Sequence, residues 1–159
     1  MSGLSKNLGP TVASVWLVGT LLASQQARAD WEYTKWGMTP EQVASALNGA
    51  VSVVSPAERN RDDANHSEIG AQGTYTSDQF RRDVEFTFDT RSGGLKCVTY
   101  NALGDDAIKL KAALISHYGA PSRESEFLES HSWLWTKPDS IEYTLGQKPV
   151  AAVVMHCAP

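Results

Sequence analysis

The 159-residue sequence has little of what metal sites and common enzyme sites need. It contains two cysteines and four histidines, and no CxxC, HxH or HxxxH spacing joins them. Such spacings are typical of metal sites, so a metal centre would need ligands from distant positions. Glycine-rich nucleotide loops and the GxSxG nucleophile motif are absent as well. We therefore expect a non-enzymatic protein without cofactors, and we assign no catalytic, cofactor-binding or metal residue.

Basic residues are in the minority. The chain has 14 Lys and Arg against 18 Asp and Glu. Leaving out Lys6 and Arg28, the only charged residues before Asp30, gives 12 basic against 18 acidic residues. An acidic chain is repelled by a phosphate backbone, so a nucleic-acid partner is not expected.

Long hydrophobic runs are also missing. The longest near the N-terminus is the twelve-residue segment 12–23 (VASVWLVGTLLA), which is too short to span a bilayer comfortably. Lys6 precedes it, and the small-residue site Ala27-Arg28-Ala29 follows it. This order is typical of a secretory signal peptide over residues 1–29, with a buried helix or membrane anchor as the alternative. We expect an exported, soluble protein, periplasmic or secreted, without a membrane span once the signal peptide is removed.

The two cysteines, Cys97 and Cys157, have two interpretations. In an oxidising compartment an even pair favours a disulfide, which we expect here. The alternative is a reactive thiol. Cys97 lies within a strand pattern, where burial would raise its pKa and lower its reactivity.

Local patterns predict two helices. Thr39 and Gln42 form a capping box and Pro40 suits the first helical position, which predicts a helix over residues 40–48. A second helix is expected from Asp105, acting as its cap, to Tyr118. The polar segment 55–72 is expected to be a loop.

Alternating apolar residues predict six strands. Val84, Phe86 and Phe88 give the clearest alternation. The expected strands are residues 73–77, 82–89, 95–102, 132–136, 141–145 and 150–156. The resulting order predicts an α+β fold of tandem αβββ units, with antiparallel sheets packed against two helices. Residues 30–159 would form one domain of two halves, about 30–102 and 103–159.

The aromatic residues have two interpretations. Two pairs of aromatic residues have the i, i+2 spacing of a strand, Trp31 with Tyr33 and Trp133 with Trp135. This spacing would suit a stacking platform for a glycan or peptide. The same spacing is ordinary for a buried core, where large aromatic side chains dominate. Trp36 is expected to pack against the first helix.

One motif carries a resemblance. Trp-Gly-Met-Thr-Pro-Glu-Gln-Val at residues 36–43, placed after a signal peptide, resembles small exported proteobacterial proteins of uncharacterised function. The tandem of helix and meander is similar in outline to β-lactamase inhibitor protein, and each half to BamE-like lipoproteins. These resemblances imply protein binding or scaffolding.

The sequence thus predicts an exported, soluble, non-enzymatic binding or interaction module. Its partner would be a protein or another envelope component. The alternative is a cell-envelope enzyme or enzyme inhibitor whose site is built from residues 55–72 and the sheet. The oligomeric state is left open.

Overall fold

The structure is a computed structural model that describes residues 31–77, 80–148 and 150–159. The expected signal peptide, residues 1–29, lies outside the described residues. Two helices and nine strands make up the regular structure of the described part. In chain order they are α1 (Pro40–Ala46), β1 (Val51–Val53), β2 (Arg61–Asp62), β3 (Ser67–Thr76), β4 (Arg81–Asp89), β5 (Leu95–Leu103), α2 (Asp105–Tyr118), β6 (Arg123–Phe127), β7 (Ser130–Trp135), β8 (Ser140–Gln147) and β9 (Val150–Cys157).

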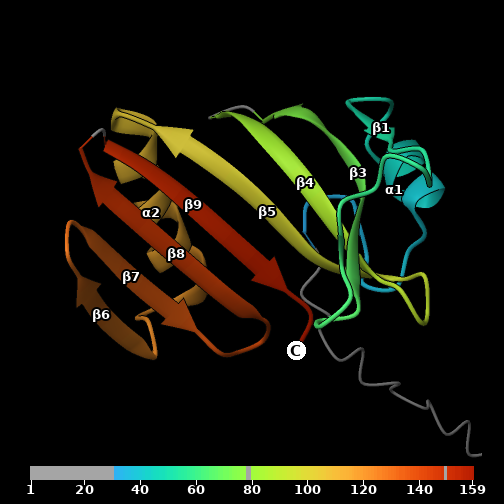
Figure 1. The fold of residues 1–159 in the computed structure, drawn as a ribbon. Helices are drawn as coiled ribbons and strands as arrows, with labels where there is room; N and C mark the ends of the chain where they lie inside the picture. The colour runs from blue at the N-terminus through green and yellow to red at the C-terminus, as the bar shows by residue number, and fades with distance from the viewer. Residues whose placement is uncertain (1–30, 78–79, 149) are drawn as a thin grey trace, which may run out of the picture.

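The strands form one antiparallel sheet (Figure 1). Its order is β1-β3-β4-β5-β9-β8-β7-β6, with β2 paired to β3 off this path. Strands β1, β3, β4 and β5 lie side by side, as do β9, β8, β7 and β6, and the two groups join where β5 pairs with β9. In that pairing Asn101 lies opposite Val153 and Val98 opposite His156. A single sheet therefore runs from one half of the chain to the other.

The expected α+β fold, with antiparallel sheets packed against two helices, is wrong. The described residues form a β-dominated fold with only two short helices, of 7 and 14 residues. Two physical reasons account for the error. The β5–β9 pairing joins the expected separate sheets into one sheet. This pairing connects strands far apart in the sequence, and local sequence patterns do not predict such contacts. Strands β1, β2 and β6 were also missed. The division of the chain into two halves stays a prediction.

Helix α1 starts with the side-chain cap that the sequence predicts, whereas helix α2 does not. The capping box of α1 is confirmed, because the Thr39 hydroxyl accepts from the Gln42 N–H and the Gln42 side chain accepts from the Thr39 N–H. Helix α2 covers the expected residues, but its N-cap is Gly104, with no side-chain capping bond. Asp105 is therefore in the first turn, where its charge suits the helix dipole.

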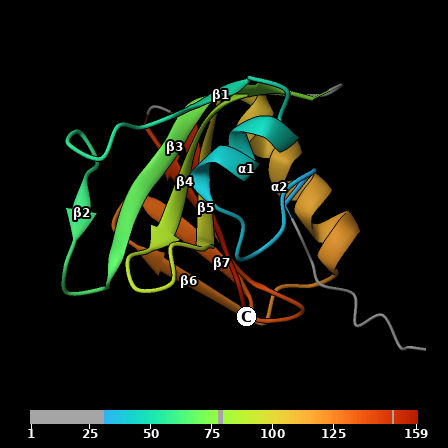
Figure 2. The same cartoon turned by 90° about the vertical axis from the view of Figure 1, so that its right-hand side faces the viewer.

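Both helices lie on one face of the sheet (Figure 2). The segment 31–38 lies on the same face, and Trp31 fills the space beneath it. The Trp31 ring meets Tyr75, Phe86 and Tyr100 at centroid distances of 5.3, 5.5 and 5.7 Å. These three aromatic residues come from neighbouring strands β3, β4 and β5. The core is thus the layer between the sheet and its helical cover, and neither helix of the described residues lies over the other face of the sheet.

Candidate functional site: the uncovered face of the sheet

The uncovered side of the sheet, here called the open face, follows from strand alternation. In β9, Val154 is fully buried under the helices, whereas the neighbouring Val153 and Met155 are 48% and 44% exposed. In β5, Leu103 is 69% exposed on the same side as Val153. Because β5 and β9 stand in the middle of the strand order, Val153 and Met155 lie at the centre of the open face, and Leu103 lies on the same face at the end of β5.

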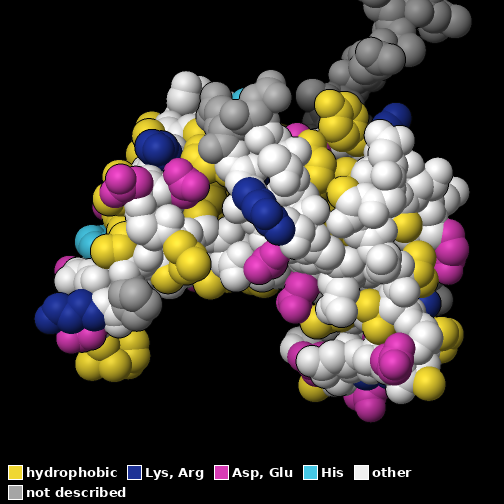
Figure 3. All heavy atoms as spheres, turned by 90° about the horizontal axis from the view of Figure 1, so that it is seen from above, with side chains coloured by type: hydrophobic (Ala, Val, Ile, Leu, Met, Phe, Trp, Pro, Cys, Tyr) yellow, Lys and Arg dark blue, Asp and Glu magenta, His cyan; other side chains and the backbone are white. Residues whose placement is uncertain are grey.

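The open face is hollowed. Figure 3 shows a recess on the lower side of the molecule, between two lobes. In Figure 2 the segment 55–66, which includes β2, stands out from the sheet on the side away from the helices. The β6–β7 end of the sheet lies at the opposite side of the recess. A shallow cavity of about 260 Å³ opens beside β4 and β5, lined by Arg81, Asp83, Asn101, Ala102, Leu103 and Asp106.

Acidic side chains border the apolar centre. Asp83 and Glu85 are exposed on β4, and Glu85 lies opposite Thr99 of β5. Hydrogen bonds from the Asn65 side chain and backbone hold the pKa of Asp62 below its usual range, so this carboxylate on the projecting segment stays charged. The open face therefore combines exposed apolar residues with several carboxylates, and Arg81 is a cation on the same side of β4.

The predicted disulfide is confirmed, and it belongs to the open face. Cys97 and Cys157 are bonded, and their Cα atoms lie 4.0 Å apart. They are directly opposite one another in the β5–β9 pairing, on the same side as Met155. The bond therefore locks together the two strands that join the halves of the chain.

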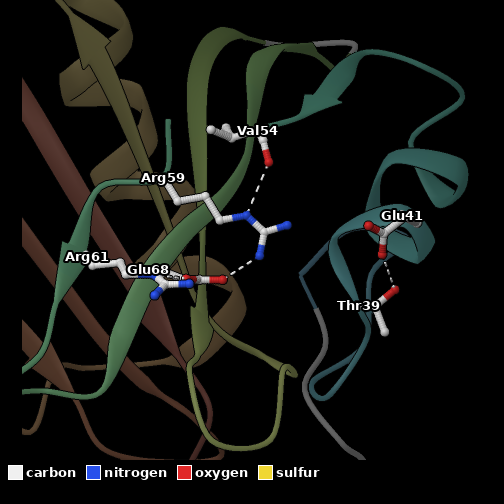
Figure 4. A network of polar contacts seen from close by, with 6 residues as sticks. All are labelled: Thr39, Glu41, Val54, Arg59, Arg61 and Glu68. Atoms are coloured by element: carbon white, nitrogen blue, oxygen red, sulfur yellow. Dashed lines mark hydrogen bonds and ion pairs between the residues drawn. The ribbon is translucent and has the colours of Figure 1, made fainter. Parts of the chain in front are cut away.

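A buried carboxylate ties the projecting segment to the sheet (Figure 4). Glu68 of β3 forms ion pairs with Arg59 and Arg61, and its side chain is only 8% exposed. The Arg59 Nε also donates to the carbonyl of Val54 over 3.1 Å. Burial opposes ionisation of Glu68, but its hydrogen bonds with the two guanidinium groups outweigh this and lower its pKa. At neutral pH the network is thus an ionised clamp across residues 54–68.

The expectation that residues 55–72 form a loop is wrong in part. Ser67–Thr76 is strand β3 and Arg61–Asp62 is strand β2. A cavity of about 350 Å³ lies beside this segment, lined by Ser52, Val53, Val54, Glu58, Asn60, Ile69 and Gln72. Glu58 is the one titratable side chain among these lining residues.

Three of the four candidate platform residues are in the core. Trp31, Trp133 and Trp135 are 4%, 5% and 1% exposed, and only Tyr33 is open to solvent, at 70%. Buried indoles cannot stack on a ligand at the surface, so the core interpretation describes these three. Trp133 is sandwiched by its neighbours, since His131 stacks on its ring at 4.4 Å and the Lys111 ammonium lies 3.4 Å from its centre.

The histidines do not converge on a metal site within the described part of the chain, where no group of three or more His, Cys, Asp or Glu side chains is placed to hold an ion. His156 is buried and contacts Asp139 at 2.8 Å. His66 and His117 are exposed. The expectations of no metal and no cofactor stay predictions.

The sequence did contain a signal for the open face. Strand β9 reads VAAVVMHC, with apolar residues at both alternations. A strand that uses only one face for the core would carry polar residues at the positions of Val153 and Met155. The excess of apolar residues on the second alternation of β9 therefore indicates a second, exposed apolar face.

We found no protein-family model, no curated protein and no solved structure that matches the chain. None of the helices in the described residues is both long enough and apolar enough to cross a membrane.

Proposed function

We propose that the chain is an exported protein-binding module that holds its partner in the recess of the open face. The observation that carries the proposal is the group of exposed apolar side chains on the open face of the two central strands, Leu103, Val153 and Met155. Contiguous exposed apolar residues inside a polar surround are typical of interaction sites. The acidic residues around this group indicate the charge of the partner.

The partner has a basic surface. Asp83 and Glu85 lie beside the apolar centre, Glu142 is on the same side of β8, and the projecting segment adds Asp62 and Asp63. Complementary charge steers association and sets which partners are accepted. A protruding loop with an apolar tip and flanking Lys or Arg residues fits the recess in both shape and charge.

Export is part of the proposal. Disulfides persist in oxidising compartments, and the Cys97–Cys157 bond is consistent with a periplasmic or secreted location. The signal peptide over residues 1–29 remains an inference from the sequence. Mass spectrometry of the exported product should give an N-terminus at Asp30, and a product that retains Lys6 would contradict it.

The alternative of an enzyme with a site in residues 55–72 has less support. The cavity beside this segment offers one carboxylate, Glu58, which is hydrogen-bonded to the Ser55 hydroxyl at 2.6 Å. The inhibitor alternative is compatible with the open face, because a partner loop held in the recess would be withheld from that partner's own substrates. The resemblance in outline to β-lactamase inhibitor protein would fit such an inhibitor, and this role stays a proposal.

A matched pair of variants tests the surface. Val153→Lys places a charge at the centre of the open face, and Ile108→Lys makes the same substitution at a position on α2 that is 57% exposed. Each purified variant is immobilised and exposed to an envelope extract, and the captured proteins are compared by mass spectrometry. We expect a basic protein that binds the wild type and Ile108→Lys but binds Val153→Lys about ten-fold more weakly or not at all.

Two further readouts make the test specific. Capture should weaken as salt is raised from about 50 to 500 mM, because charge pairs at the border are screened. Glu85→Gln should weaken capture without removing it. If a partner is captured equally by wild type and Val153→Lys, or is lost only in Ile108→Lys, the open face is not the binding site.

A further inference from the structure

A third cavity lies on the opposite side of the sheet from the open face, under helix α2. It has a volume of about 570 Å³ and is bounded by α2, by β4 and β5, and by the segment that contains Trp31. Leu110, Leu114 and Phe80 give it apolar walls, and Arg82, His117 and His156 give it polar ones. No step of the proposed function uses this cavity.

Arg82 is the unusual feature of the cavity wall. It is 7% exposed and points to the helix-covered side of β4, opposite Tyr75. Its guanidinium carbon lies 5.0 Å from the ring centres of both Phe80 and Tyr100. The two rings hold the guanidinium in place by cation–π contact.

The charge of Arg82 has no carboxylate partner among the described residues, in which the ion pairs involve other side chains. Its Nε is buried without a hydrogen-bond partner, the one side-chain atom in the described residues with this property. A buried cation without a carboxylate at ion-pair distance is unfavourable, and an unmade hydrogen bond adds to the penalty. An anionic group bound in the cavity would therefore be stabilised by pairing with the buried Arg82 guanidinium.

The lining limits the charge of that anion. Glu32 is also in the wall, where it accepts a hydrogen bond from the Tyr75 hydroxyl at 3.3 Å. This carboxylate repels every negative charge on a ligand, so a single charge that Arg82 can pair with is favoured over two. Guanidinium groups bind carboxylates in a two-bond geometry, and the apolar walls suit a hydrocarbon body.

We propose that this cavity binds a small monocarboxylate with an apolar body, and that Arg82 pairs with its carboxylate. The site lies across the sheet from the open face. It is thus independent of the partner proposed there, and either proposal can fail without the other.

Benzoate and benzamide are suitable probes, because they share shape and differ in charge. Calorimetric titration of the folded protein at pH 7 should show saturable binding of benzoate, and binding of benzamide at least about ten-fold weaker. Arg82→Gln should lose the preference for benzoate. Equal binding of the two probes, or no saturable binding of benzoate, would overturn the proposal.

A cavity-filling variant keeps the test decisive if Arg82→Gln fails to fold. Ala113 of α2 lines the cavity and is half-buried, so Ala113→Phe fills the space and leaves Arg82 in place. The neighbouring Ala112 is exposed and does not line the cavity, and Ala112→Phe is the matched control. We expect benzoate binding to be lost in Ala113→Phe and retained in Ala112→Phe, whereas unchanged binding in Ala113→Phe would place the ligand elsewhere.

Discussion

The imidazole of His156 and the carboxylate of Asp139 form a buried pair, with Nε2 2.8 Å from Oδ2 and both side chains 2% exposed. The pair connects β9 to the turn before β8. Trp36 joins it from the other half of the chain, because its indole N–H donates to the same Oδ2 at 3.3 Å. The ring of Tyr118, at the end of α2, lies 6.0 Å from the imidazole. Strand β9, the turn before β8, the segment that contains Trp36 and the end of α2 therefore meet around this pair.

This pair predicts that stability falls in mildly acidic solution. Burial lowers the pKa of His156 below 6.5, and the hydrogen bond that Asp139 accepts from the imidazole offsets only part of this effect. The unfolded chain then binds a proton more readily than the folded one. Stability is complete above the unfolded pKa and is lost as the pH falls below it. Urea unfolding at pH 7.5, 6.5 and 5.5 should show a decrease of at most about 1.4 kcal/mol per pH unit below 6.5.

His156→Gln supplies the control for this dependence. The other three histidines are unchanged in the variant, so their contribution is the same in both proteins. The variant should be less stable at pH 7.5 and should lose much of the decrease between pH 6.5 and 5.5. A wild-type protein that becomes more stable on acidification would instead show that an imidazolium–carboxylate pair forms, contrary to the prediction.

Trp36 supports a second prediction. Trp36→Phe keeps an aromatic ring beside His156 but removes the indole N–H that donates a hydrogen bond to Asp139. Loss of one hydrogen bond to a charged acceptor should lower the free energy of unfolding by about 1.5 kcal/mol. Tyr33→Phe, at a side chain that is 70% exposed, is the control and should change stability by less than about 0.5 kcal/mol.

A double-mutant cycle with Asp139→Asn assigns the loss to this contact. If Trp36 and Asp139 interact, the two destabilisations will not add, because either substitution alone already removes the charged hydrogen bond. Additive effects would mean that Trp36 acts through packing only.

Local chemistry in the sequence identified the elements that depend on near neighbours. The capping box of Thr39 and Gln42 placed α1, and the alternation of Val84, Phe86 and Phe88 placed β4. The expected helices and the six expected strands all have counterparts in the structure, with most ends shifted by one or two residues, but β3 starts six residues before the expected strand 73–77. Where a segment buries one face, its own pattern is enough to predict it.

The missed elements are those without such a pattern. Strand β6 (RESEF) is exposed at all five residues, so no apolar alternation marks it. Strand β1 has three residues and β2 has two, and both are defined by pairing to β3. The same holds for the site, because the recess exists only once β5 and β9 pair. Trp36 was expected to pack against α1, but its hydrogen bond and ring contact are to Asp139 and His156, about a hundred residues away in sequence.

The clamp around Glu68 gives a third prediction. Glu68→Gln removes the charge that pairs with Arg59, whose side chain is only 15% exposed. An uncompensated, mostly buried guanidinium should lower stability by about 2 to 3 kcal/mol at pH 7. Because the pKa of Glu68 is lowered by the fold, its contribution is present above about pH 4.5 and is lost as the pH falls further.

Thermal unfolding at pH 7 and pH 4 checks this prediction. The difference between wild type and Glu68→Gln should be large at pH 7 and smaller at pH 4. Glu124→Gln, at an exposed position of β6, is the control and should leave the melting temperature unchanged at pH 7. A Glu68→Gln variant as stable as wild type at pH 7 would show that the projecting segment is held by its backbone alone.

The disulfide gives the last prediction, which concerns the joint between the two halves of the chain. The bond links residues 60 apart in sequence, so it restricts the unfolded chain. Chain entropy for a loop of this length predicts a loss of about 4 kcal/mol when both cysteines are replaced by serine. Guanidinium unfolding of Cys97→Ser/Cys157→Ser should show this loss, and wild type in reducing agent should agree with the variant. The untreated exported protein should have a mass two hydrogens below that of the reduced chain and no free thiol. Equal stability with and without the bond would mean that β5 and β9 are held by their backbone hydrogen bonds and by the packing beneath them.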